Sequence, residues 1–248
     1  VQKRRYKMNN FRKLAISAGI LFIIYTCVDV LSSLFLGPVT ATNYLVSVSE
    51  NAGLVGTGAF LLLIGGACAS GIAISLYPVL KKSNPVLALG AVGFRISEGV
   101  LRFVSVCILL SIITLSQLFV KAGAPESSYF QTLGELLLAA RGWVSHVGAL
   151  LAFSIWCTLY YIIFYQTKLV PRWISVWGLV FGILGIVSCA LVSTGLIAPF
   201  STVQVVMLIP MLPQEIVLAV WLIVKGFNPS AIASLSAKTA TDELSSAA

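Results

Sequence analysis

The stretch from Val86 to Leu118, VLALGAVGFRISEGVLRFVSVCILLSIITLSQL, is an apolar run interrupted by Arg95, Glu98 and Arg102. Its length exceeds the roughly 20 residues with which an α-helix crosses a hydrocarbon core about 30 Å thick. The spacing of three and then four residues places all three charges on one helical face. Each such group at membrane depth costs about 2.5–3.5 kcal/mol, so these groups usually face the protein interior and mark a site.

The rest of the chain has the composition of a multi-pass membrane protein. Of its 248 residues, 58% are hydrophobic and 10% are charged, whereas a soluble domain has about 25% charged residues. An ordinary soluble fold is therefore excluded, and we expect one all-α bundle of six transmembrane helices. The expected spans are Leu14–Leu36, Gly53–Tyr77, Val86–Leu118, Trp143–Tyr165, Ile174–Ala198 and Val203–Lys225.

The expected domain organisation follows from these spans. A basic cytoplasmic segment (1–13) precedes the six-span domain (14–227), and a Ser-, Ala- and Thr-rich tail (228–248) is expected to be disordered. The first span is longer than a signal-peptide core of about 7–15 residues, so we expect it to be retained. Between the third and fourth spans, Ser127–Arg141 mixes apolar and polar residues, which suggests a short helix on the outer membrane surface.

Lysine and arginine residues lie mostly on one side of the predicted membrane. Twelve flank the side that carries the two termini, whereas only Lys121 and Arg141 fall on the other. By the positive-inside rule, both termini are expected in the cytoplasm. The net charge of +8 then reflects topology and contact with anionic lipid headgroups, and no nucleic-acid partner is expected.

A rise of 1.5 Å per residue predicts which charges share a depth. Asp29 and Arg102 both lie about 23–24 Å from the cytoplasmic ends of their spans, and Glu215 and Arg95 lie about 13–15 Å deep. We therefore expect two ion pairs, with Glu98 between the two layers. Three acids against two arginines leave one carboxyl to be protonated or matched by a cation, and Glu98 is the candidate. Alternatively, Glu98 bridges both arginines along its own helix and only fixes the packing.

Two prolines interrupt the sixth span. Pro210 and Pro213 remove amide donors immediately before Gln214 and Glu215, so the helix should kink or unwind near its middle. Irregular backbone at membrane depth is tolerated where it faces protein or a water-filled cavity. The resulting candidate ligand-binding residues are Asp29, Arg95, Glu98, Arg102, Gln214 and Glu215.

The chain lacks the residues of familiar catalytic and metal centres. His146 is its only histidine, which excludes two-histidine haem ligation and argues against a histidine-based zinc site. The five cysteines lie one in each of the first five spans, without close partners for a disulfide or metal cluster. Walker, HExxH and GxSxG motifs are absent. We expect no cofactor, no metal and no catalytic residues.

Three stretches together resemble a bacterial membrane-protein family called domain of unknown function 4386. They are Leu76–Leu80 (LYPVL) with Gly90–Ile96 (GAVGFRI) and Glu98, then Leu169–Leu179 (LVPRWISVWGL), then Gln214–Phe227 (QEIVLAVWLIVKGF). The resemblance extends from about Lys13 to Phe227 in the same order. The three stretches contain Arg95, Glu98, Arg172, Gln214 and Glu215, whereas Asp29 and Arg102 lie outside them. The family name implies an integral membrane protein and supplies no activity.

Three classes of function remain open. The leading one is a non-enzymatic protein of the bacterial cytoplasmic membrane that binds a small solute, ion or lipid headgroup for transport or sensing. Arg95 and Arg102 would then hold an anionic group, and Glu98 and Glu215 a cation or proton. The second is a structural or regulatory subunit whose charges fix helix packing, and the third is an intramembrane enzyme acting on lipid.

Small residues four apart in the second and fifth spans allow close helix packing, within the chain or in an oligomer.

Overall fold

Six helical segments are long and apolar enough to cross a membrane, as the sequence predicts. The computed structural model describes residues 2–125, 129–199 and 201–246, and this part of the chain is helical and contains no strand. The segments are formed by α1 (Gln2–Phe35), α3 (Ala52–Leu80), α4 (Pro85–Lys121), α5 (Tyr129–Trp143) continued by a π-helical turn (Val144–Ala149) and α6 (Leu150–Thr167), α7 (Arg172–Ser193), and α8 (Thr202–Leu208) followed by α9 (Met211–Val224).

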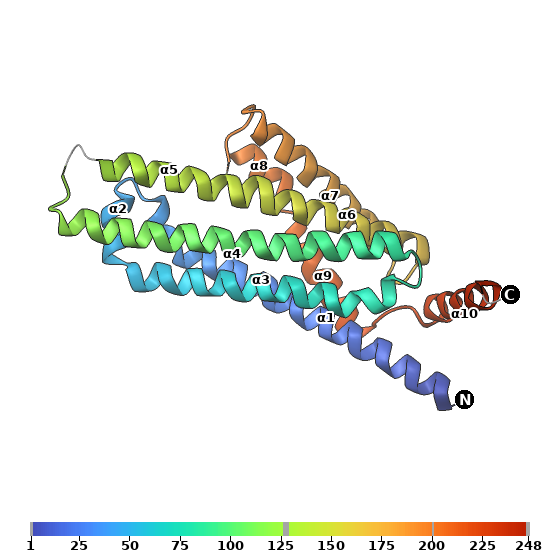
Figure 1. The fold of residues 1–248 in the computed structure, drawn as a ribbon. Coiled ribbons are helices and arrows are strands. Elements are labelled where there is room, and N and C mark those ends of the chain that lie inside the picture. Colours follow the sequence, from blue (N-terminus) through green and yellow to red (C-terminus); the bar gives the residue numbers. More distant parts are fainter. Residues whose placement is uncertain (1, 126–128, 200, 247–248) are drawn as a thin grey trace.

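The helices form one bundle in which α4 and α1 have central positions. Helix α4 packs against both α3 and α6, and α1 packs against both α3 and α9, while α7 covers α6. The start of α1 and the last helix, α10 (Pro229–Ser246), lie at the same end of the bundle (Figure 1). A short 3₁₀ turn (Gly37–Thr40) and α2 (Tyr44–Glu50) connect α1 to α3 at the opposite end, which we call the distal end.

Helices α4 and α5 extend the bundle at the distal end. Helix α4 has 37 residues and the continuous α5–α6 segment has 39, so each is about 55–60 Å long at 1.5 Å per residue. Helix α7 has 22 residues, or about 33 Å. The distal parts of α4 and α5 therefore project beyond α7 and α8 (Figure 1).

This extension corrects the expectation of a surface helix over Ser127–Arg141. From Tyr129 onward the segment is one helix that runs directly into the fourth span, while residues 127–128 lie outside the described part. The apolar face of α5 has a protein partner, because Phe130 packs with Phe119 of α4 and Leu45 of α2. A helix that buries its apolar face in this way does not need the membrane surface.

The last helix differs from the disordered tail expected from residue 228. Pro229 occupies the first position of α10, and the side chain of Asn228 accepts a hydrogen bond from the Ser230 amide at 3.1 Å. Ala231 and Ile232 are buried in the main hydrophobic core. Capping and this anchored first turn favour a helix that composition alone does not indicate.

The proline-induced break in the sixth span is confirmed. Helix α8 ends at Leu208 and α9 begins at Met211, with Pro210 in the turn between them. Pro213 lies in the first turn of α9, where a missing amide costs no intrahelical hydrogen bond. The break places Gln214 and Glu215 in the second turn of α9, and both face the bundle interior.

Glycines set the distance between α3 and α4. A Cβ added at Gly99 would lie 2.8 Å from the carbonyl oxygen of Gly66, and one added at Gly66 would lie 3.1 Å from the carbonyl oxygen of Gly99. The small-residue face of the fifth span also packs within the chain, since a Cβ at Gly182 would contact the backbone of α6. These close approaches bring polar residues of neighbouring helices within hydrogen-bonding reach.

We predict that Gly99→Ala destabilises the protein by about 1–3 kcal/mol, because the new methyl group would overlap backbone that cannot rotate away. The thermal midpoint of the purified protein in detergent measures the loss. Gly93→Ala is the matched control, since Gly93 lies on α4 and a Cβ there would meet nothing within 4 Å. The control should be neutral or slightly stabilising through helix propensity; equal effects of the two substitutions would contradict the close approach.

Candidate functional site

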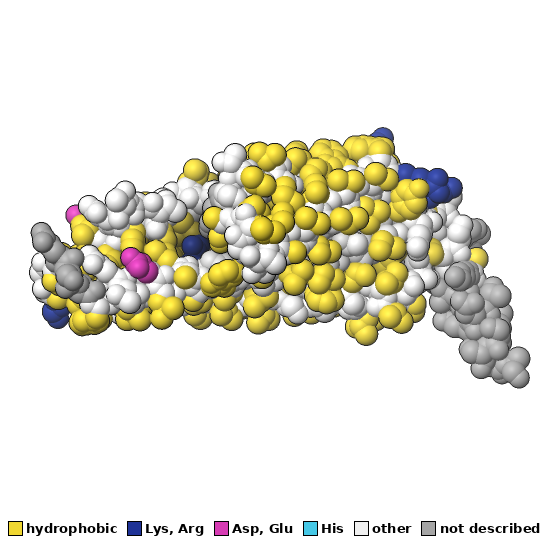
Figure 2. Space-filling model, turned by 90° about the horizontal axis from the view of Figure 1, so that it is seen from above, with side chains coloured by type: hydrophobic (Ala, Val, Ile, Leu, Met, Phe, Trp, Pro, Cys, Tyr) yellow, Lys and Arg dark blue, Asp and Glu magenta, His cyan; other side chains and the backbone are white. Residues whose placement is uncertain are grey.

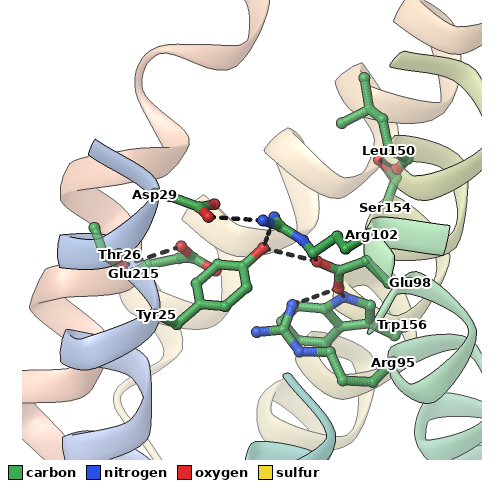
Figure 3. Close-up of polar contacts among 10 residues, drawn as sticks. All are labelled: Tyr25, Thr26, Asp29, Arg95, Glu98, Arg102, Leu150, Ser154, Trp156 and Glu215. Carbon is green, nitrogen blue, oxygen red and sulfur yellow. Dashed lines mark hydrogen bonds and ion pairs between the residues drawn. The ribbon is translucent and has the colours of Figure 1, made fainter. Parts of the chain in front are cut away.

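Glu98 is the centre of a hydrogen-bond network that joins three helices (Figure 3). Its side chain is 1% exposed, and each carboxylate oxygen accepts two hydrogen bonds. The donors are Arg95 Nη1 (2.6 Å) and Arg102 Nε (3.0 Å) of α4, Tyr25 Oη (2.7 Å) of α1 and Trp156 Nε1 (2.9 Å) of α6. Two cationic and two neutral donors together replace the water that this carboxylate loses on burial.

Arg95 is stabilised by aromatic rings as well as by its carboxylate. Its side chain is 0% exposed, and its Nε and Nη2 have no hydrogen-bond partner within the described part of the chain. The guanidinium carbon lies 4.1 Å from the ring centre of Trp156 and 4.5 Å from that of Tyr25. Phe22 and Phe153 are within 6 Å. Cation–π attraction therefore compensates for the missing hydrogen bonds.

Arg102 connects Glu98 to Asp29. Its Nη1 donates to Asp29 Oδ1 at 2.7 Å, and its Nη2 donates to the hydroxyl of Tyr25, which in turn donates to Glu98. The side chains of Arg102 and Asp29 are 19% and 31% exposed, so this end of the network reaches an accessible space. The network thus runs from the buried interior at Arg95 to a partly open site at Asp29.

The structure confirms one of the two predicted ion pairs. Asp29 and Arg102 are paired as expected. The predicted Glu215–Arg95 pair is wrong, because Arg95 binds Glu98 and no ion pair of Glu215 occurs among the described residues. The alternative in which Glu98 bridges both arginines is the observed one. The carboxyl left without an arginine is accordingly Glu215 rather than Glu98.

Gln214 and Glu215 occupy separate environments on α9. Gln214 bonds to the Tyr161 hydroxyl (2.6 Å) and to the Ile174 carbonyl (3.4 Å), so it joins α9 to α6 and α7. Glu215 is near the network, and its Oε2 accepts a hydrogen bond from Thr26 of α1 at 3.5 Å (Figure 3). Of the six predicted site residues, four are therefore linked directly, Glu215 lies beside them, and Gln214 belongs to a different contact.

Two neighbouring cavities border the network. The distal cavity, about 450 Å³, extends from Asp29 and Arg102 to Arg141 and His146 at the distal end. The lateral cavity, about 210 Å³, lies between α1 and α9 and includes Glu215. Both are lined by Asp29, Arg102, Leu150, Phe153 and Leu208. The space-filling view shows a hollow in the surface with Lys or Arg atoms at its base (Figure 2).

The π-helical turn between α5 and α6 forms part of the distal cavity. Ser145, His146 and Ala149 line the cavity, and Ser145 is hydrogen-bonded to Ser105 of α4 at 2.8 Å. The Cys189 thiol of α7 lies 3.9 and 3.8 Å from the carbonyl oxygens of His146 and Val147, within the range of sulfur hydrogen bonds. Such turns are frequent at functional sites because they reposition side chains within a helix.

Several residues of the site are not among the predicted ones, although the sequence contains a signal for some. Tyr25 precedes Asp29 by four residues, so it shares that helical face. Phe153, Trp156 and Tyr160 follow at spacings of three and four, which marks one aromatic face of α6. Arg141 has no such signal, because the sequence predicts it at the end of a helix on the membrane surface.

We predict that Glu98→Gln lowers the free energy of unfolding by about 3–5 kcal/mol, because it leaves Arg95 as an uncompensated buried cation. The folded yield and the thermal midpoint in detergent measure the effect. Asp29→Asn should cost about 1 kcal/mol or less, since the Asp29–Arg102 pair is partly solvated and screened.

Glu135→Gln is the control for this prediction. Glu135 is exposed on α5 and forms no ion pair within the described residues, so its substitution should leave stability unchanged. A Glu98→Gln protein as stable as the wild type would contradict the structural role assigned to the carboxylate.

Comparison with known proteins identifies the family of this chain. No curated protein and no solved structure matches it. A family model described as Domain of unknown function (DUF4386) matches residues 17–226. Because this match covers most of the chain, and because six helices can cross a membrane, the protein is a multi-pass membrane protein of the DUF4386 family.

Proposed function

We propose that the protein binds a small organic anion, carrying a carboxylate or phosphate group, in the distal cavity. The observation that carries the proposal is the side chain of Arg141, which lines this cavity and forms no ion pair with any described residue. Its Nε is buried and lacks a hydrogen-bond partner in that part of the chain. A buried N–H group without an acceptor is costly, and a bound anion would supply the acceptor.

The rest of the cavity suits such a ligand. Arg102 forms part of the cavity wall and is bonded to both Glu98 and Asp29. It therefore offers N–H donors to a ligand, while these two acids balance most of its charge. Ser32, Ser105 and Ser145 contribute hydroxyl groups. A volume of about 450 Å³ lies within the range of about 300–1,000 Å³ that is typical of small-molecule sites.

We place the protein in the bacterial cytoplasmic membrane with both termini in the cytoplasm. The lysine and arginine distribution supports this orientation. A cleft of about 610 Å³ lined by Lys168, Arg172, Lys225 and Trp221 supports it as well, since basic and aromatic residues suit an anionic cytoplasmic headgroup layer. The distal cavity would then take its ligand from the extracytoplasmic side.

A structural role is the second candidate, and the completed hydrogen bonding of Glu98 favours it. A carboxylate with four donors has no vacant position for a ligand. Glu98 and Arg95 would then fix the register of α1, α4 and α6, while binding is confined to the distal cavity. The two roles use different residues and are separable by mutation.

We predict that Arg141→Gln weakens anion binding about 10–100-fold, because a hydrogen bond to a charged group contributes about 1.5–3 kcal/mol. The measurement is the rise in thermal midpoint of the purified protein on adding inorganic phosphate or short-chain mono- and dicarboxylates. A second series with anionic phospholipid distinguishes a headgroup from a free solute.

Lys121→Gln is the matched control for Arg141→Gln. It removes one positive charge from the same end of the bundle, at the end of α4 and outside the cavity. The control should retain the anion-dependent shift. Equal shifts in the wild type, Arg141→Gln and Lys121→Gln, or no shift with any anion, would contradict the proposal.

A further inference from the structure

Glu215 is a buried carboxyl whose hydrogen bonding is incomplete. The residue is 7% exposed, and its only hydrogen bond in the described structure is the long one from Thr26 at 3.5 Å. Its Oε1 is buried and has no partner there. The side chain lines the lateral cavity between α1 and α9. This arrangement contrasts with Glu98, whose two oxygens are both fully occupied.

The charges around Glu215 do not compensate an ionised carboxylate. Asp29 on α1 and Glu98 on α4 are acidic, and Arg95 and Arg102 on α4 already bind these two acids. The four charges therefore cancel without Glu215. The other titratable groups near it are neutral hydroxyls and a thiol, namely Tyr25 on α1 and Cys157 and Tyr161 on α6.

The surroundings of Glu215 also argue against a calcium ion as the missing partner. A calcium ion takes about 6–8 oxygen ligands. Half of the lateral cavity is lined by apolar residues, including Leu208, Met211 and Leu212. The other side-chain oxygens in its wall are those of Tyr25, Thr26 and Asp29, and Tyr25 and Asp29 are already bonded to Glu98 and Arg102. No group of metal-ligating side chains occurs among the described residues. A proton needs only the carboxylate oxygen itself, so it fits this site better than a calcium ion does.

We propose that Glu215 is a proton-binding site, neutral in the resting protein, which exchanges its proton through the lateral cavity. The proposal does not rest on anion binding in the distal cavity. Release of the proton would leave an ionised carboxylate beside Asp29 and Glu98. It could then be compensated only by drawing Arg95 or Arg102 away from the acid that each now binds.

Reaction with dicyclohexylcarbodiimide tests the proposal on the wild-type protein. A protonated carboxyl transfers its proton to a carbodiimide nitrogen, and the carboxylate oxygen then bonds to the central carbon. The resulting O-acylisourea rearranges to a stable N-acylurea, so the whole reagent is added and nothing leaves. We expect mass spectrometry of the membrane-embedded protein to find the adduct at Glu215, with a rate that falls as the pH rises.

Glu98 and Asp29 are internal controls in the same experiment. Both are paired with arginine and are expected to stay unmodified. Glu215→Gln should reduce labelling to the background level. An adduct at Glu98 or Asp29 in place of Glu215 would overturn the proposal.

Infrared spectroscopy gives a readout that does not depend on reagent access. The wild-type spectrum at neutral pH should contain the C=O band of a protonated carboxyl, which is missing in Glu215→Gln and disappears from the wild type at alkaline pH. If the variant fails to fold, carbon-13 labelling of glutamate in the wild type shows whether the band comes from a glutamate or an aspartate, and the carbodiimide adduct identifies which glutamate it is. Absence of such a band at neutral pH would overturn the proposal regardless of the labelling result.

Discussion

The fold depends on the burial of one carboxylate. Glu98 lies at membrane depth on α4, where an unpaired charge would be prohibitively expensive, and it is satisfied only when α1, α4 and α6 are all in place. Because each of its oxygens has two donors, a shift of any of the three helices along its axis would leave a polar group unpaired. Helix packing in lipid has little hydrophobic driving force of its own, so such polar contacts specify the register.

The sequence was sufficient to predict the membrane class, the six spans and the charged face of α4. These features depend on composition, length and helical period, all of which are local. The Asp29–Arg102 pair could also be predicted, because the rise per residue fixes depth along each helix. The Glu215–Arg95 pair failed because depth does not specify which helices are neighbours. Helix α9 packs against α1, so Glu215 meets Thr26 instead.

The aromatic environment of Arg95 shows a second limit of sequence reasoning. Matching charges by sign and depth considers only acids as partners, yet Trp156 and Tyr25 contribute ring faces as well as hydrogen-bond donors. Likewise, Arg141 lines the distal cavity only because the tertiary structure brings α5 next to it. The partner of the α5 apolar face is the distal part of α4, and no local pattern indicates that two long helices extend together.

The π-helical turn determines which residues of the long α5–α6 helix lie on the same face. Arg141, Ser145, Ala149 and Phe153 are spaced by four residues and all line the distal cavity. In a regular α-helix, three such steps would rotate the last side chain by about 120° from the first, because 3.6 residues complete a turn. The wider turn absorbs this rotation. It acts as a one-residue insertion. Deletion of one residue there would rotate Arg141 by about 100° relative to Trp156 and would turn it away from the cavity without moving the buried network.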